Sequence, residues 1–351
     1  MWRRFQVLMV AAGFVGAACG GTSVAADDTQ ASAAASGTVW VTERTPGTSS
    51  VTAFDAATGR VLGTTAVGSR PIGITNPHGS KYVYSSDESA NQLSVIDKAT
   101  ITVVKTIPTG LGPHHLMASP NGKRIYVAEF GSNYVGVVDT ELNQRVAGYL
   151  ADPEPTARTH AVWITGDGKD LYATNTHVVR SSVGNIAKFN ASTGERLWNF
   201  AVGKDPSEIL VTPDRKIGYV SIRGENKILV LDLTGSLPAV IGEAEANNEP
   251  DTLSLTNDKK TLIVGLRAPS TGPARMALID TKTLTTTYVL IPGHTITGHQ
   301  WLSANSHFTY IAVEKPGALV VIDNQTASVV TEYPYPTGGT QPHGVFYEPS
   351  V

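Results

Sequence analysis

Four of the nine histidines in this sequence occur just before a run of β-forming residues, each after a short loop. They are His114, His160, His299 and His343. The corresponding places in three other segments hold Ile72, Ser207 and Asp251. Neutral imidazole binds Zn or Cu, and three or four such ligands, with a carboxylate if one is near, make a usable site. The spacing therefore predicts a Zn or Cu site formed by the four histidines and Asp251, provided that the fold brings them together.

The same histidines also fit a purely structural role. An imidazole at the start of a strand can hydrogen-bond to nearby backbone and so cap the strand. A shift of one residue along a strand would also aim the rings between neighbouring units instead of at one another. Metal binding, strand capping and a pH-responsive cluster therefore all remain open.

Arginine is concentrated in the loops near these histidines, whereas lysine is more frequent in the opposite set of turns. The guanidinium fork matches carboxylate or phosphate, whereas the ammonium group of lysine is a strongly hydrated point charge. We therefore expect the arginine-bearing loops to hold a small anionic ligand or a protein partner. The candidate ligand contacts are His115, His177, Arg158, Arg223 and Arg267. The alternative is that the arginines pair with acidic residues of the same loops, which include Glu43, Glu129, Glu225, Glu249 and Glu314.

The composition narrows the classes of protein that are possible. Of the 351 residues, 41% are hydrophobic and only 16% are charged, and the chain contains 34 glycines and 20 prolines. Such a chain has enough apolar surface to fold and is rich in turns, which favours β-structure. The formal net charge of −3 gives no basic excess for nucleic acid, so no nucleic-acid partner is expected.

The N-terminus is typical of an export signal. Arg3 and Arg4 precede an uncharged stretch, 5–18, which ends at the chain's single cysteine, Cys19. The stretch is shorter than the roughly 20 apolar residues of a membrane-spanning helix. We expect lipoprotein-type cleavage before Cys19, with ordinary cleavage after Ala26 as the alternative. Residues 1–26 are then the signal and 27–37 a flexible tether. The mature protein would lie in the periplasm or at the cell surface, with membrane contact only through a lipid on Cys19.

From residue 38 to residue 351 the sequence repeats. An aromatic or aliphatic pair that opens a strand recurs seven times at spacings of 42 to 48 residues, at Trp40, Tyr82, Tyr126, Tyr172, Tyr219, Leu262 and Tyr310. The unit around Tyr126 contains four β-like runs, over 115–119, 124–129, 135–139 and 146–150. Units of this length with four antiparallel strands predict an all-β, seven-bladed β-propeller. The chain starts at a second strand (38–42) and ends at a first strand (342–347), so we expect the C-terminal strand to complete the N-terminal blade and close the ring.

The run from Pro120 to Val127, with Asn121 and Gly122 in its turn, and the run from Val135 to Asp139 resemble the YVTN-family β-propeller repeat of exported surface proteins. The resemblance covers residues 38–351 and implies the propeller fold, but it says almost nothing about function.

In a propeller, loops that enter the innermost strands share one face with loops between the second and third strands, and we call this the upper face. The histidines and arginines described above belong to it. Our first hypothesis is an exported binding or scaffold protein that holds a small anionic ligand, a metal or a protein partner on the upper face. The alternative is a Zn- or Cu-dependent enzyme or metal carrier with a histidine cluster at the channel mouth and hydrolase, lyase or lactonase chemistry. At the level of the fold, the predicted propeller resembles propellers that bind copper or zinc.

The export hypothesis can be tested by changing the cysteine. We expect Cys19→Ser to move the protein from the membrane fraction to the soluble fraction, because the lipid has no other thiol to join, whereas Ser23→Ala should leave it in place. Intact mass of the mature protein is the measurement. An unmodified chain that begins at Asp27 would contradict lipidation.

Overall fold

The computed structural model describes residues 36–267, 272–336 and 338–350. The predicted signal, the lipidation site Cys19 and the tether up to residue 35 lie outside the described residues. Within these ranges no helix is long and apolar enough to cross a membrane.

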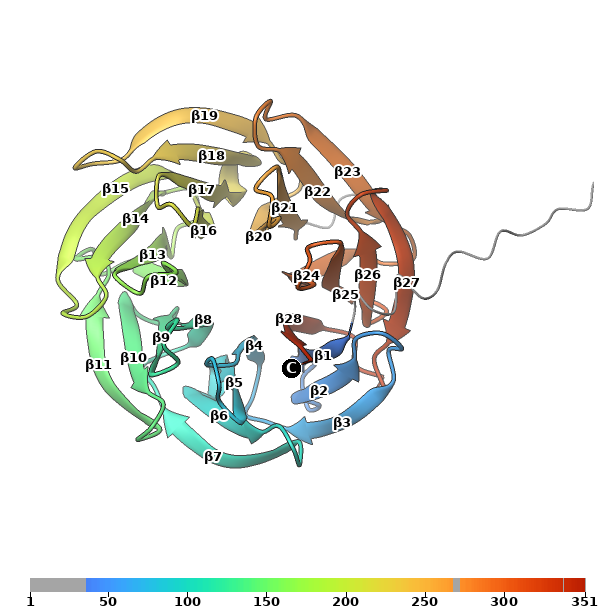
Figure 1. The fold of residues 1–351 in the computed structure, drawn as a ribbon. Helices are drawn as coiled ribbons and strands as arrows, with labels where there is room; N and C mark the ends of the chain where they lie inside the picture. The colour runs from blue at the N-terminus through green and yellow to red at the C-terminus, as the bar shows by residue number, and fades with distance from the viewer. Residues whose placement is uncertain (1–35, 268–271, 337, 351) are drawn as a thin grey trace, which may run out of the picture.

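Seven four-stranded antiparallel sheets are arranged in a ring around a central channel (Figure 1). The innermost strands, in order around the ring, are β28 (Pro342–Pro349), β4 (Pro71–Thr75), β8 (Pro113–Ala118), β12 (Ala157–Ile164), β16 (Pro206–Val211), β20 (Pro250–Leu255) and β24 (Ile296–Leu302). The second strands are β1 (Gly37–Glu43), β5 (Tyr82–Asp87), β9 (Arg124–Glu129), β13 (Asp170–His177), β17 (Ile217–Ile222), β21 (Thr261–Leu266) and β25 (Phe308–Glu314). The predicted seven-bladed propeller is confirmed.

The outer half of each blade follows the same plan. The third strands are β2 (Ser50–Asp55), β6 (Gln92–Asp97), β10 (Tyr134–Asp139), β14 (Val183–Asn190), β18 (Lys227–Asp232), β22 (Ala274–Asp280) and β26 (Ala318–Asp323). The outermost strands are β3 (Val61–Ala66), β7 (Thr102–Pro108), β11 (Gln144–Leu150), β15 (Arg196–Lys204), β19 (Ala239–Glu245), β23 (Thr286–Ile291) and β27 (Ser328–Pro334). Two 3₁₀ turns, η1 (Glu88–Ala90) and η2 (Arg223–Glu225), follow β5 and β17.

The burial of the inner strands explains why 41% of the residues are hydrophobic. Every residue of β25 is buried, because neighbouring blades cover both faces of the strand, whereas β27 alternates between exposed and half-buried residues at the rim. Strands covered on both sides need continuous apolar runs rather than alternation. The core therefore lies between blades, as in the cluster that joins Phe54 and Val345 to Tyr310 and Leu319.

The ring closes as predicted. β28 pairs with β1, with Trp40 opposite Phe346 and Val41 opposite Val345. Tyr347 stacks on Tyr310 of the preceding blade, with ring centroids 5.5 Å apart, and its hydroxyl donates to the Ser36 carbonyl at 2.7 Å. One blade is thus built from both ends of the chain.

Each third strand ends in an aspartate, or in Asn190 for β14, whose side chain accepts hydrogen bonds from backbone amides of the turn that follows. The Asp55 carboxylate accepts a hydrogen bond from the Thr58 amide at 2.9 Å, and Gly59 has a φ of 68°. An aspartate that binds its own turn and a glycine at positive φ together stabilise a tight turn.

The register of the innermost strands corrects one sequence interpretation. In each innermost strand the pairing with the second strand is interrupted near the start. His114, His160 and His343 each follow directly after the last paired residue before this interruption. In β24 that paired residue is Thr297, so Gly298 takes this position and His299 lies one residue further along. His299 is therefore level with His115, not with His114.

Closure of the ring contributes to the free energy of unfolding, and Tyr347 allows this contribution to be measured. Tyr347→Ala removes a buried ring that links the C-terminal strand to the preceding blade, so we expect a loss of about 3 to 5 kcal/mol in the free energy of unfolding. The exposed Val330 on β27 is the matched site, and Val330→Ala should cost less than about 0.5 kcal/mol. Equilibrium urea denaturation measures both values. A loss below about 1 kcal/mol for Tyr347→Ala would contradict the closure argument.

Candidate functional site

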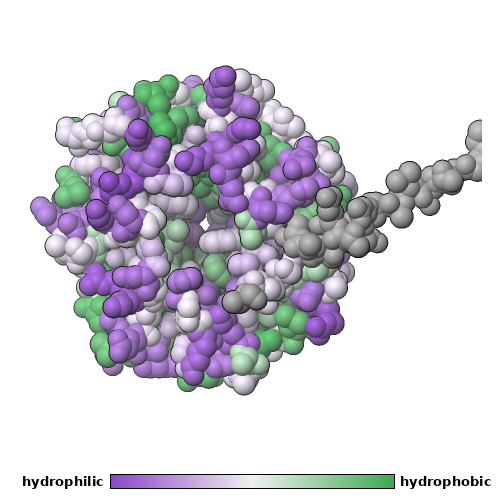
Figure 2. Space-filling model, viewed as in Figure 1, coloured by the Kyte–Doolittle hydropathy of each residue, from purple (hydrophilic) through white to green (hydrophobic). Residues whose placement is uncertain are grey.

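The innermost strands of all seven blades surround the channel axis (Figure 1), and the disc is hollowed there (Figure 2). Two levels can be distinguished. The channel mouth is the cluster at the upper face that comprises Arg44, His114, His160, Arg223, Asp251, Arg267, Glu314 and His343. The axial cavity, defined below, lies beneath it.

Four histidines form two neighbouring pairs: three of them belong to the mouth, and His299 belongs to the axial cavity. The His114 and His160 ring centroids are 4.5 Å apart, and the His299 and His343 centroids are also 4.5 Å apart. His114 Nδ1 lies 3.2 Å from the His160 carbonyl oxygen, and His160 Nδ1 lies 2.9 Å from that of Ser207. An imidazole nitrogen opposite a carbonyl oxygen must carry the proton and donate it. These two histidines therefore bind the backbone of the next blade, as the capping hypothesis expects.

The metal hypothesis gains no support from this arrangement. Among the residues that the structure describes, no group of three or more His, Cys, Asp or Glu side chains is placed to hold a metal ion. The second nitrogen of His160, Nε2, lies 3.2 Å from Arg223 Nη1. The positive charge of this guanidinium disfavours binding of a metal cation to Nε2. The Zn or Cu site stays a prediction.

A buried network of charges occupies one side of the mouth. Arg223 is 4% exposed, and its two terminal nitrogens contact Asp205 at 2.9 Å and Asp251 at 3.3 Å. Burial disfavours the charged form of Asp251, but Arg223 and Arg267 outweigh it and lower the pKa of this carboxyl far below its ordinary value. Asp251 is thus held as the anion in the interior. Across the mouth, Arg44 pairs with Glu314 at 2.6 Å.

Five histidines of the channel, His114, His115, His160, His299 and His343, are neutral at physiological pH. Burial is the main cause that lowers the pKa of His160 and His299 to about 3 and that of His115 to about 4. Burial also lowers the pKa of His114 and His343 well below the ordinary value. At neutral pH the fixed charges of the mouth therefore come from its arginines and carboxylates alone.

Arg267 differs from the other arginines of the mouth. It is half-buried at the end of β21, and no hydrogen bond or ion pair joins its guanidinium to another described residue. Asp251 and Glu314 act on it electrostatically, but they already pair with Arg223 and Arg44. Burial lowers the pKa of Arg267, although a guanidinium remains charged at physiological pH.

Other predicted contacts lie apart from this cluster. The Arg158 guanidinium donates to the carbonyl of Ala157 at 2.7 Å, and His177 Nδ1 lies 3.2 Å from Thr156 Oγ1. Glu129 is held by Arg145 at 2.7 Å. The alternative that loop arginines pair with acidic residues thus holds for Arg44, but Arg223 pairs with aspartates that were not expected as partners.

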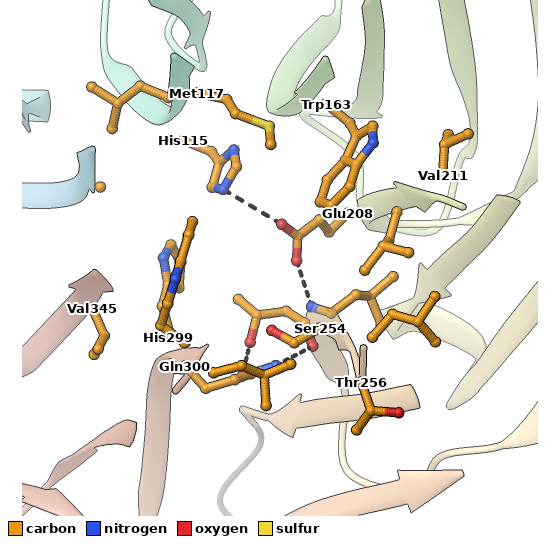
Figure 3. Close-up of a pocket in the computed structure, with 18 of the residues that line it drawn as sticks. His115, Met117, Trp163, Glu208, Val211, Ser254, Thr256, His299, Gln300 and Val345 are labelled. Atoms are coloured by element: carbon orange, nitrogen blue, oxygen red, sulfur yellow. Dashed lines mark hydrogen bonds and ion pairs between the residues drawn. The ribbon is translucent and has the colours of Figure 1, made fainter. Parts of the chain in front are cut away.

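The axial cavity has a volume of about 540 Å³ and is lined by residues of all seven innermost strands (Figure 3). His115, predicted as a ligand contact of the upper face, points into it, together with His299. Sequence reasoning missed Glu208 and Gln300, which also line it. The signal for Glu208 was an acidic residue directly after Ser207, inside a strand that is otherwise mostly apolar.

Comparison with known proteins identifies the family. The family described as YNCE-like beta-propeller matches residues 69–345, and the chain belongs to this family. No curated protein matches the sequence.

Solved structures share the fold. A Bacteroides fragilis protein named provisionally as a 6-phosphogluconolactonase has a TM-score of 0.69 and 20% identity, over 90% of this chain and 98% of its own. The periplasmic gluconolactonase of Pseudomonas aeruginosa has a TM-score of 0.67 and 15% identity, over 89% and 98%. Hydrazine synthase of Kuenenia stuttgartiensis has a TM-score of 0.67 and 20% identity, over 82% and 90%. At such identities these likenesses show the fold alone.

The buried neutral histidines predict a loss of stability in acid. Their pKa values of about 3 to 4 in the folded protein lie below the ordinary value of about 6.5, so the unfolded chain binds more protons as the pH falls. Their stabilising contribution is complete above pH about 6.5 and decreases toward pH about 3, by about 1.4 kcal/mol per pH unit for each histidine.

His160→Asn isolates one of these groups. Urea denaturation between pH 7.5 and pH 4.5 should give a shallower loss of stability for this variant than for the unaltered protein. His78→Gln, at an exposed turn, should leave the slope unchanged. Equal slopes for all three proteins would mean that His160 is not buried in the neutral form.

Proposed function

We propose that this YNCE-like β-propeller is a binding protein that holds a small anion of carboxylate or phosphate chemistry at the channel mouth. The observation that carries the proposal is Arg267, a half-buried guanidinium at the mouth with no ion-pair partner among the described residues. The other two arginines of the mouth, Arg44 and Arg223, already pair with carboxylates.

Partial burial of the Arg267 guanidinium costs free energy because the charge loses part of its hydration. A charge that loses water without gaining a partner destabilises the folded protein. An anion from solvent that contacts Arg267 would remove this cost, and the planar fork of arginine suits a carboxylate or a phosphate in a bidentate contact. Half-burial supports this reading, since the guanidinium remains accessible while it is only partly hydrated.

Further donors lie at the same mouth. Two buried donors, Arg44 Nε and Arg223 Nε, have no hydrogen-bond partner within the described ranges, and His343 Nδ1, which donates in one of the two neutral tautomers, has none either. Unsatisfied buried donors are uncommon in native proteins and point to a missing acceptor. An acceptor-rich anion would supply one, and the neutral histidines add no charge of their own.

Two earlier expectations accompany this proposal. The N-terminal sequence supports binding outside the cytoplasm, on a protein anchored through Cys19. The metal-dependent lactonase or hydrolase remains the alternative, and the lactonase names of two structures with this fold make it worth an assay; element analysis of protein purified from its native compartment would detect bound Zn or Cu.

Substitution of Arg267 tests the proposal. In calorimetric titrations with inorganic phosphate and with citrate at constant ionic strength, we expect saturable binding to the unaltered protein. Arg267→Gln should weaken it by about tenfold or more, because the charge-assisted contact is lost.

Arg196→Gln is the matched control. Arg196 is exposed on the outermost strand β15, where it donates to the Leu150 carbonyl, so its loss should not change the affinity. Equal weakening by both substitutions would indicate unspecific charge attraction. Absence of binding to the unaltered protein, for either anion at millimolar concentration, would refute the proposal.

A further inference from the structure

We infer that the axial cavity is a second binding site, separate from the mouth, which takes an uncharged amphipathic molecule: a hydrogen-bonding head at its inner end and an apolar body along its walls. The inference does not depend on the proposed anion site, because the two sites use different residues.

The cavity opens away from the mouth. Its inner end is formed by the buried residues Glu208, Thr252, His299 and Gln300. The exposed residues of its lining are Pro213, Asn257 and Lys259, which lie in turns at the lower face. Arg267, Asp251 and His343 do not line the cavity. A ligand would therefore enter from the lower face.

The walls between entrance and inner end are apolar. Leu116, Met117, Trp163, Leu210, Trp301 and Val345 line them. A volume of about 540 Å³ lies within the range of small-molecule pockets, which are mostly apolar with a few convergent polar groups. Two tryptophans on the wall provide a large apolar surface for the body of a ligand.

The polar groups at the inner end are fixed by hydrogen bonds (Figure 3). Glu208 Oε2 accepts from the Leu253 amide at 2.6 Å, and Oε1 lies 3.4 Å from His115 Nε2. The Val162 amide donates to His115 Nδ1 at 3.4 Å, which places the proton of the ring on Nε2, toward Glu208. Gln300 Nε2 donates to the Thr252 carbonyl at 3.0 Å. Internal hydrogen bonds already occupy the Gln300 amide, so a head group would bond to the Glu208 carboxyl and to the His299 ring.

The inner end carries no net charge at neutral pH. Burial raises the pKa of Glu208 to about 8, so the carboxyl is mostly protonated, and the neighbouring imidazoles of His115 and His299 are neutral. A carboxylate head would lose its hydration there and be repelled by the Asp251 anion, which also raises the pKa of Glu208, and an ammonium head would find no ionised carboxylate among the lining residues. A hydroxyl, carbonyl or amide head would keep its hydrogen bonds.

Three probes with the same tail and different heads test this choice. We would titrate 1-octanol, octanoate and octylamine by calorimetry at pH 6.5 into the Arg267→Gln protein, so that anion binding at the mouth does not contribute. We expect 1-octanol to bind at least about tenfold more tightly than either charged probe. Tighter binding of octanoate or octylamine, or no saturable binding of 1-octanol, would overturn the inference.

Two further substitutions locate the binding. Ser254→Trp fills the cavity from its half-buried wall and should weaken 1-octanol binding at least about tenfold, whereas Ser328→Trp adds the same side chain on the exposed rim and should have no effect. Circular dichroism confirms that both fold. Should Ser254→Trp fail to fold, Leu255→Trp fills the cavity from a second half-buried wall position and should weaken 1-octanol binding to the same extent. Unchanged binding in a folded cavity-filling variant would contradict the inference.

Discussion

The antiparallel pairing of β28 with β1 is the constraint on which the rest of the structure depends. It joins the two ends of the folded chain in one blade and holds the seven innermost strands around a common axis. Side chains that are far apart in the sequence meet there only because the circle is complete. Arg44 from the first blade and Glu314 from the last form an ion pair, for example, and the His343 ring lies beside the His299 ring at a tilt of 46°. Both proposed sites therefore depend on closure of the ring.

Successive residues of the innermost strands serve different levels of the channel. His114 and Asp251 lie in the mouth, whereas the next residues, His115 and Thr252, line the cavity. The pairing with the second strand is interrupted at His114 and His115, and likewise at Asp251 and Thr252, so one short segment supplies both levels. The mouth gathers fixed charges and the inner end of the cavity gathers groups that are neutral at pH 7. This partition is the physical reason for proposing two ligands of different chemistry.

The sequence predicted the fold in detail because its period is regular and each unit contains the same turn residues. The strand 124–129 has the predicted bounds, and the closing strand begins at Pro342 as expected. The one-residue shift of His299 relative to His114 and His160 could also have been predicted from the sequence. His114 and His160 lie twelve residues before Tyr126 and Tyr172, whereas His299 lies eleven residues before Tyr310. Of the histidines predicted for the upper face, His114 and His160 lie in the mouth, whereas His115 and His299 line the cavity beneath it.

The partners of these side chains could not be predicted from the sequence. Whether an imidazole turns to a metal, a backbone carbonyl or an arginine depends on distances between blades, which no local pattern encodes. The bonds of His160 to the Ser207 carbonyl and to Arg223 join three different segments. Burial of Glu208 likewise depends on strands from other blades that enclose the cavity, so its raised pKa had no signature in its own segment.

Anion binding at the channel mouth is tested most directly by a crystal structure of the protein soaked with selenate. The anomalous scattering of selenium locates the anion. We expect a selenium peak at the channel mouth within hydrogen-bonding reach of the Arg267 guanidinium, with Arg44 and Arg223 still paired to Glu314 and Asp251. A mouth without a peak, with Arg267 itself paired to one of those carboxylates, would contradict the proposal.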